Sequence, residues 1–297
     1  MYSEITSNKR RTWVLIILMS SIVVGLSWFI GSLAGLEAAP SIILGTIIAT
    51  IYSLVSYYAS SSIALSVSGA KPIVKSQAPD LYNVIENLCI ANGQKTPAIY
   101  IIEDASPNAF ATGRDPEHAS VAFTTGLLAL LTREELEGVA AHELSHVKNY
   151  DIRVMTIVVV LVGLISLISS ILIHVRIGRG DSKNGNAALI LMLVGILLAV
   201  LSPIFAQAIQ LAISRSREYL ADASGALLTR YPEGLASALT KIGAKGVPMQ
   251  NANHATAHLF LSNPFGATKE KRSWFSNLFA THPPIEDRIA RLRNMGR

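Results

Sequence analysis

Two histidines and a glutamate stand together in one short stretch, His142-Glu143-Leu144-Ser145-His146. On a helix, side chains four positions apart lie on one face, so His142 and His146 can point at one metal ion with the spacing that tetrahedral zinc requires. Glu143 then lies beside the metal without binding it, where its carboxylate can take a proton from an activated water. The pattern therefore predicts a zinc hydrolase in which Glu143 is the base. The alternative is two solvated histidines on an ordinary helix.

A zinc hydrolase needs a third protein ligand, and the residues just after His146 do not provide one. Asn149 stands where the longer metzincin pattern requires glycine, and no histidine follows at the required distance. The spacing ExxxD occurs once in the chain, from Glu218 to Asp222, and it puts both carboxylates on one helix face. We expect Glu218 to be the third ligand and Asp222 to orient a ligand histidine through a hydrogen bond.

Other histidines are weaker candidates for the metal. His254 and His258 are also four positions apart, but no glutamate stands between them and their segment resembles a loop, so we expect surface histidines. His118 lies in a polar turn and should be solvated. His282 precedes two prolines and keeps two interpretations, since it could stabilise a tetrahedral intermediate or cap the last helix.

The pattern around the motif predicts the elements that position it. Thr132 and Glu135 form a capping box, which predicts a helix from about Arg133 to Lys148 that carries both histidines. Apolar runs predict two strands, over residues 98–102 and 119–124, and turn residues predict a loop over 106–113. Residues 284–295 are predicted to form a C-terminal amphipathic helix.

The composition is that of a membrane protein. Of 297 residues, 51% are hydrophobic and only 15% are charged, whereas soluble chains usually carry about 25% charged residues. The apolar surplus lies in four uncharged runs, each long enough for the roughly 20 helical residues that cross a bilayer. They cover residues 13–30, 41–65, 154–175 and 187–213. The alternative, buried helices of a soluble protein, is disfavoured by four long runs without a charge.

Charge predicts the orientation, because cytoplasmic loops carry an excess of Lys and Arg. Most of the basic clusters flank the polar sections and favour a cytoplasmic N-terminus and active site, whereas one cluster would lie in an external hairpin. The favouring residues are Lys9, Arg10, Arg11, Lys71, Lys75, Lys148, Arg153, Arg215 and Arg217, and the opposing ones are Arg176, Arg179 and Lys183. The net charge of +5 is spread along membrane boundaries, so no nucleic-acid partner is expected.

The chain is expected to have an α+β fold that is mainly helical, with four transmembrane helices and a protease domain that contains a small sheet. Residues 1–65 would form an N-terminal transmembrane hairpin, and residues 152–213 a second one. The cytoplasmic protease domain would then consist of residues 66–151, with the HExxH helix, and residues 214–297, with the third ligand. The single cysteine, Cys89, excludes an intramolecular disulfide and is expected to be a small buried residue.

With these residues in hand, the chain resembles the HtpX-type membrane metalloproteases, which are relatives of the CAAX prenyl proteases. The resemblance covers nearly the whole length. Besides the N-terminal hairpin and the HExxH helix, it rests on Ser106-Pro107-Asn108-Ala109-Phe110-Ala111, Ser216-Arg217-Glu218-Tyr219-Leu220-Ala221-Asp222, and Thr281-His282-Pro283-Pro284 with Arg288.

The resemblance implies a gluzincin-like fold with one zinc ion per chain, held by two histidines and one glutamate. It implies that the loop with Asn108 lies by the active-site cleft, where Asn108 binds substrate or the oxyanion. It also implies that Val121, Ala122, Phe123 and Thr124 belong to an edge strand to which an extended substrate adds.

The function implied by the resemblance is a zinc endopeptidase of a prokaryotic plasma membrane that removes misfolded or damaged membrane proteins, with its active site facing the cytoplasm. Its partners would be unfolded protein substrates and the lipid bilayer. Two other classes remain open. One is a catalytically silent membrane scaffold that keeps zinc as structure. The other is a transporter, which would need charged or polar residues inside the spans, and these have almost none.

Overall fold

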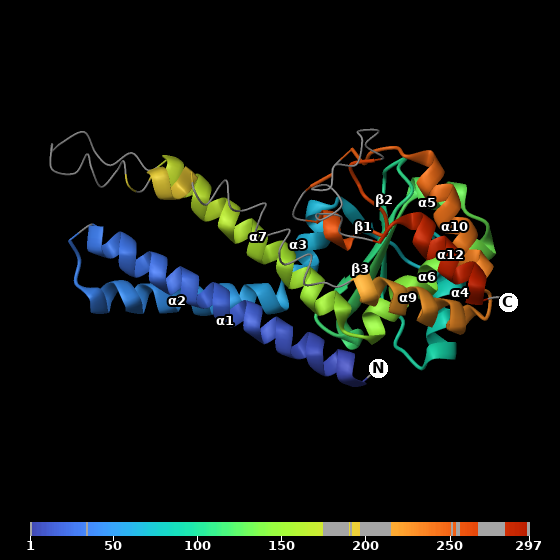
Figure 1. Ribbon diagram of the computed structural model, residues 1–297, viewed down its shortest axis with the longest axis horizontal. Helices are drawn as coiled ribbons and strands as arrows, with labels where there is room; N and C mark the ends of the chain where they lie inside the picture. Colours follow the sequence, from blue (N-terminus) through green and yellow to red (C-terminus); the bar gives the residue numbers. More distant parts are fainter. Residues whose placement is uncertain are drawn as a thin grey trace.

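The computed structural model describes residues 2–33, 35–174, 190, 192–196, 215–250, 252–253, 256–266 and 283–295. Long apolar helices extend from one end of a body that combines helices with a small sheet (Figure 1). Most of the fourth predicted run, together with His254 and His282, lies outside the described residues.

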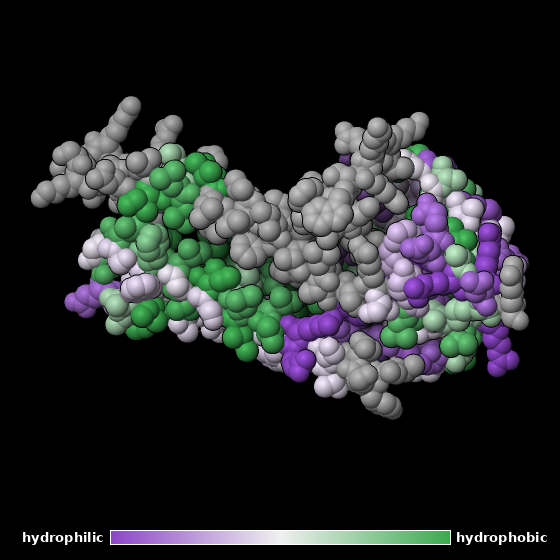
Figure 2. Space-filling view, viewed as in Figure 1, coloured by the Kyte–Doolittle hydropathy of each residue, from purple (hydrophilic) through white to green (hydrophobic). Residues whose placement is uncertain are grey.

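Three helices of the described part are long and apolar enough to cross a membrane, over Ile5–Leu33, Ala38–Tyr58 and Asp151–Ile173. They belong to α1 (Tyr2–Leu33), α2 (Ala38–Tyr58) and α7 (Asp151–His174). Hydrophobic residues gather at this end of the molecule and hydrophilic residues at the opposite end (Figure 2). The first three predicted spans are therefore confirmed as helices of spanning length. The second ends earlier than expected, because the chain turns at Ala59 into the short helix α3 (Ser60–Val67).

A four-stranded mixed sheet forms the centre of the body. Its strands are β1 (Ala70–Pro72), β2 (Ala98–Ile102), β3 (Ala109–Gly113) and β4 (Ala119–Thr124), in the order β1-β2-β4-β3. β2 and β4 run parallel, and the two outer pairs are antiparallel. The two predicted strands are confirmed.

Two predictions about this sheet were wrong. Residues 109–113, expected in a loop, form strand β3, which pairs with β4 from Ala109 opposite Phe123 to Gly113 opposite Ala119. Because β4 pairs with β2 on its other side, Val121, Ala122, Phe123 and Thr124 lie in the interior of the sheet and not at its edge. The edges are β1 and β3.

The two faces of the sheet carry different parts of the molecule. Ile99, Val121 and Phe123 pack in one cluster with α4 (Pro79–Asn92) and α6 (Arg133–Lys148). The alternate residues, such as Phe110 and Ala122, face α3, α7 and the short helix η2 (Ala257–Leu259). Figure 1 shows the same arrangement, with α6 on one side of the sheet and α3 and α7 on the other. The HExxH helix and the pair α3 and α7 therefore pack on opposite faces of the sheet.

The HExxH helix α6 begins as predicted, with both hydrogen bonds of the Thr132–Glu135 capping box present. It packs against α9 (Arg215–Thr229) and α10 (Pro232–Lys245), and α12 (Ile285–Met295) covers α9 and α10. The remaining short elements are η1 (Pro116–His118) and α5 (Thr125–Leu130). α9 approaches α6 closely at Gly225, where an added Cβ would lie 3.0 Å from the backbone nitrogen of His142.

Replacing Gly225 by Ala is expected to weaken metal binding, because the new methyl group forces α9 and Glu218 away from α6. Overpacking of this kind costs about 1–3 kcal/mol, so we expect a lower melting temperature and about tenfold weaker zinc binding. Gly243→Ala in α10 is the matched control, since its Cβ would meet Ile285 at an ordinary 3.5 Å. Competitive zinc titration of both variants checks this, and equal affinities would contradict it.

Candidate metal centre

Three side chains from two helices converge on one point. The ligand atoms of His142, His146 and Glu218 all lie within 4.8 Å of one another. The two histidine Nε2 atoms are 3.2 Å apart, and the Glu218 carboxylate oxygens lie 3.5 Å from His146 Nε2 and 4.0 Å from His142 Nε2. Nitrogen and oxygen ligands arranged tetrahedrally around zinc are about 3.3–3.6 Å apart. The donor set and its spacing therefore fit one zinc ion.

The helices explain why these residues meet. α6 places His142 and His146 one turn apart on the same face, and α9 lies against that face with Glu218 in its first turn. All three side chains are buried; His146, the most exposed, is 5% exposed. Glu218 was expected to supply the third ligand atom, and its position beside the two histidines agrees with this.

Each ligand histidine is supported by a carboxylate on its other ring nitrogen. Asp222 Oδ1 lies 2.9 Å from His142 Nδ1, and Asp151 Oδ2 lies 3.0 Å from His146 Nδ1. Such partners fix the tautomer and leave the Nε2 lone pairs free to bind a metal. Asp222 stands where the sequence analysis expected it. Asp151 was missed, and the available signal was its position as the last acidic residue before an uncharged run, since an acid at the start of a membrane span needs a partner.

Arg288, contributed by α12, holds Asp222 in place. Its Nη2 and Nε donate to the two carboxylate oxygens of Asp222 at 2.7 and 2.9 Å, and its Nη1 lies 3.7 Å from Glu218 Oε2. Burial alone would raise the pKa of Asp222, but the Arg288 charge and the hydrogen bonds with His142 and Arg288 together outweigh it and lower this pKa to about 2. The same carboxylates raise the pKa of Arg288 in spite of its burial. Asp222 therefore stays ionised against His142.

Glu143 lies beside the ligand cluster without belonging to it. Its side chain is buried, and burial raises its pKa to about 7. The backbone N–H of Ala111, on strand β3, acts in the opposite direction and lowers this pKa slightly. A carboxylate with a pKa near neutral can both accept and return a proton, so the arrangement suits general base and acid chemistry.

The two histidines differ in their affinity for a proton in the metal-free chain. Burial lowers the pKa of His142. Burial also acts to lower that of His146, but the hydrogen bond with Asp151 and the charge of Glu218 outweigh it and raise this pKa to about 9. A metal ion must therefore displace a proton from His146.

The first helix reaches the metal centre through Asn8, which is fully buried. Asn8 Nδ2 donates to Asp151 Oδ1 at 2.7 Å and to the Asn149 carbonyl at 2.9 Å. Arg217 Nη1 donates to Asn8 Oδ1 at 2.9 Å and to Asp151 Oδ1 at 3.3 Å. Asn8 thus connects α1 to His146 through Asp151. Neither Asn8 nor this role of Arg217 was anticipated, because the contacts join residues far apart in the chain.

Asn108, which is expected to lie at the cleft, hydrogen-bonds through its side-chain amide to the backbone of Ser262. Its Nδ2 donates to the Ser262 carbonyl at 2.9 Å, and its Oδ1 accepts from the Ser262 N–H at 3.1 Å. The Leu261 N–H donates to the Ala109 carbonyl at 2.9 Å. The segment 256–266 is thereby tied to the beginning of β3.

The other candidate histidines have separate outcomes. His258 was expected at the surface, which was wrong: it is buried, and its Nε2 lies 2.8 Å from the Met155 carbonyl, because the segment 256–266 packs on α7. His118 is exposed and pairs with Asp115 at 2.7 Å. Cys89 is buried, as expected for a small apolar residue.

The chain is similar to proteases over its whole length. Residues 75–296 match Peptidase family M48. A "Protease HtpX homolog" of Tropheryma whipplei (strain Twist) is 46% identical over 296 residues, which cover 100% of this chain and 99% of that protein. A "Protease HtpX homolog" of Thermoanaerobacter pseudethanolicus is 44% identical over 305 residues, with 99% and 98% covered.

A likeness to a solved structure concerns the fold. The crystal structure of S. mikatae Ste24p matches with a TM-score of 0.51 and 18% sequence identity. The match covers 98% of this chain and 66% of that one. The similar fold therefore extends over membrane helices and body together.

Replacing Asn8 by Leu is expected to speed the loss of zinc, because leucine fills a similar volume but neither donates to Asp151 nor accepts from Arg217. Removing the hydrogen-bond partner of a ligand typically weakens metal binding about 10- to 100-fold. Asn8 acts one step further out, through Asp151, so we expect the lower end of that range, about tenfold faster transfer of zinc to a chelator. Thr12→Val is the control, since the Thr12 hydroxyl donates to the Asn8 carbonyl within α1. Equal rates of zinc transfer in the two variants would show that Asn8 does not support His146 through Asp151.

Zinc binding is expected to release a proton at neutral pH. The pKa of about 9 at His146 means that the metal-free imidazole is charged below that pH and uncharged above it. Zinc affinity should therefore rise as the pH rises towards 9, by about tenfold per pH unit for each proton displaced. Calorimetric titrations in buffers of different ionisation enthalpy count the protons, and Asp151→Asn should reduce their number. An affinity independent of pH would show that His146 is already neutral.

Proposed function

The chain belongs to peptidase family M48, and on that premise we propose that it cleaves misfolded or damaged proteins of the membrane in which it is embedded. It is an HtpX-like membrane metallopeptidase with a metal site formed by His142, His146 and Glu218. The observation that carries the finer proposal is the hydrogen-bonded path from α1 through Asn8 and Asp151 to His146. The metal centre is thereby joined to a membrane helix, so substrates reach it at the membrane surface.

The proposed reaction is hydrolysis of an internal peptide bond. When bound, zinc supplies a Lewis acid that polarises the carbonyl and lowers the pKa of water. Glu143 takes the proton of the attacking water and returns it to the leaving amine, for which its pKa of about 7 is suited. Asp222 and Asp151 hold the two imidazoles in orientation. Glu143 does not bind the metal in this scheme.

Asn108 and His282 are proposed to stabilise the oxyanion, as donors to the developing negative charge. In the described residues the amide of Asn108 is engaged by the backbone of Ser262. For Asn108 to reach a substrate, the segment 256–266 must therefore move away from the start of β3.

Strand β3 replaces β4 as the strand to which a substrate would add. Its outer edge already carries two hydrogen bonds, from the Leu261 N–H to the Ala109 carbonyl and from the Gly113 N–H to Thr156 Oγ1. Between them, the Ala111 N–H is directed at the carboxylate of Glu143. A peptide extended along this edge would lie next to the proposed base and would be recognised by its backbone, which favours unfolded segments over a particular sequence.

A cytoplasmic active site is the orientation that the charges favour. α1 begins beside the metal centre, so the N-terminus and the site lie at the same end of α1. Lys9, Arg10 and Arg11 precede the apolar part of that helix, and such residues remain on the cytoplasmic side. We therefore place the protease body in the cytoplasm, against the plasma membrane.

The scaffold alternative is less well supported. A structural zinc site normally has four protein ligands, whereas a catalytic site has three and an open position. Within the described residues the cluster contains three. Among the described residues no salt bridge holds the buried Glu143 next to it, and a role as base explains its place.

Glu143→Gln is expected to keep zinc and to lose at least about 100-fold of the cleavage rate, the usual contribution of a general base. Glu218→Ala should lose zinc and activity together. Glu137→Gln is the matched control, since Glu137 lies on the same helix and pairs with Arg133 at the surface. The measurement is cleavage of an unfolded protein and of a destabilised membrane protein by the purified full-length chain, with zinc assayed in parallel. Zinc-loaded wild type that cleaves neither would support the scaffold.

A further inference from the structure

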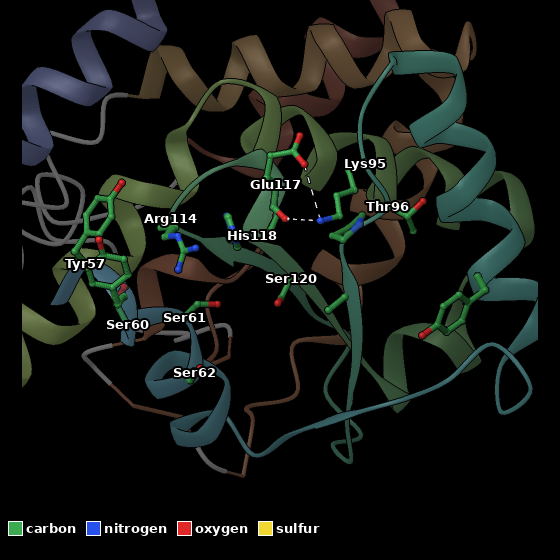
Figure 3. A pocket seen from close by; sticks show the side chains of 15 residues that line it. Tyr57, Ser60, Ser61, Ser62, Lys95, Thr96, Arg114, Glu117, His118 and Ser120 are labelled. Carbon is green, nitrogen blue, oxygen red and sulfur yellow. Dashed lines mark hydrogen bonds and ion pairs between the residues drawn. The ribbon is translucent and has the colours of Figure 1, made fainter. Parts of the chain in front are cut away.

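A cavity of about 580 Å³ lies apart from the metal centre. It is open to one side and is lined by the end of α2, the beginning of α3, Tyr82 of α4, the segment before β2, and the turn that joins β3 to β4. None of the proposed metal ligands or catalytic residues lines it. The lining includes the small side chains Ala98, Ala119 and Ser120. Figure 3 shows Ser120 between Arg114 and Lys95.

The cavity lies where the membrane surface should be. α2 exposes apolar side chains along its length as far as Leu54 and Val55. It then ends with Tyr57 and Tyr58, and both tyrosines line the cavity. Tyrosine is enriched at the boundary between hydrocarbon and water. Hydroxyl side chains, Ser60 to Ser62, follow immediately. The cavity is thus at the level of the lipid headgroups.

The polar lining has the chemistry of a phosphate site. Arg114 and Lys95 bring two permanent positive charges, and Glu117 is the one acidic residue among the lining side chains. Glu117 is 3.9 Å from Lys95, and its carbonyl accepts from Lys95 Nζ at 3.1 Å, so this side of the cavity is held together (Figure 3). The hydroxyl groups of Ser61 and Ser120 can donate to the same anion.

Arg114 is held in position by its neighbours, and its guanidinium has more N–H donors than these contacts use. Its guanidinium stacks on the ring of Tyr58, 5.3 Å from the centroid, and its Nε lies 3.6 Å from Asp115 Oδ2. Its carbonyl accepts a hydrogen bond from Arg153, and the Arg153 guanidinium stacks on Tyr57. A guanidinium has five N–H donors in a planar fork that matches phosphate oxygens. Arg114 and Arg153 therefore form a basic surface at the C-terminal end of α2, each placed over the ring of a tyrosine.

We propose that this cavity binds the phosphate headgroup of an anionic phospholipid from the adjacent leaflet. Arg114 and Lys95 bind the phosphate oxygens, the serine hydroxyls contact the glycerol end, and the acyl chains lie along the exposed apolar side of α2. The volume is within the range of about 300–1,000 Å³ that small-molecule sites occupy. A lipid, rather than free phosphate, is the occupant because the cavity is continuous with the apolar surface of a membrane helix.

The test is native mass spectrometry of the full-length chain, released from detergent with phosphatidylglycerol or phosphatidylcholine. We expect at least about tenfold preferential retention of the anionic lipid, and about tenfold loss of that retention in Arg114→Gln, as for one charge-assisted contact. Ser61→Leu, which fills the cavity without changing charge, should have the same effect. Arg133→Gln is the control, because Arg133 is an exposed arginine on α6, paired with Glu137.

Each remaining outcome counts against the proposal. Equal retention of the two lipids would overturn the choice of an anionic headgroup. Displacement of the lipid by inorganic phosphate at equal concentration would identify a free-anion site instead. Unchanged retention in both Arg114→Gln and Ser61→Leu, with the zinc content of each variant intact, would place the lipid elsewhere. None of these measurements depends on peptide cleavage, so they stand or fall independently of the proposed function.

Discussion

The structure depends on balancing buried charge. Four carboxylates, those of Asp151, Glu218, Asp222 and Glu143, lie buried around two histidines. Buried carboxylates are tolerated only when they are paired or bind a metal. Within the described part of the chain, Arg288 and Arg217 supply two buried positive charges. A zinc dication held by His142, His146 and Glu218 would add two positive charges and so offset much of the remaining negative charge.

This balance requires segments that are distant in sequence to dock together. The carboxylates and arginines come from α6, from the first turn of α7, from α9 and from α12. A displacement of α12 would remove Arg288 from Asp222 and leave a charge uncompensated, which costs far more than the loss of an apolar contact. The close approach of α9 at Gly225 shows how tightly this docking constrains the backbone. The body is therefore one structure, although α7 and the residues that follow it stand between its two parts in the sequence.

Local sequence patterns predicted the helix α6 and the metal ligands. They did not predict strand pairing or contacts between residues far apart in the sequence. The capping box located α6, and HExxH with ExxxD identified all three side chains of the metal site. The strand β3 was missed because Ala109–Gly113 follows the turn residues Pro107 and Asn108 and consists mostly of small residues, without the alternation that marks a half-buried strand. Its partner β4 is buried on every residue, so nothing in its sequence says whether one or two neighbours pair with it. Asn8 carries no motif, and its role depends on contacts more than 140 residues away.

The membrane helices of the described residues do more than anchor the body. α1 meets the metal centre through Asn8, and α7 begins with Asp151, which orients His146. α2 ends at the cavity built on Tyr57 and Tyr58. Each span therefore contacts the body through polar groups, whose hydrogen bonds need specific geometry, and not only through apolar packing. Asn8 and Asp151 therefore connect α1 and α7 to a histidine of the metal site, so the positions of these two helices and the orientation of His146 depend on each other.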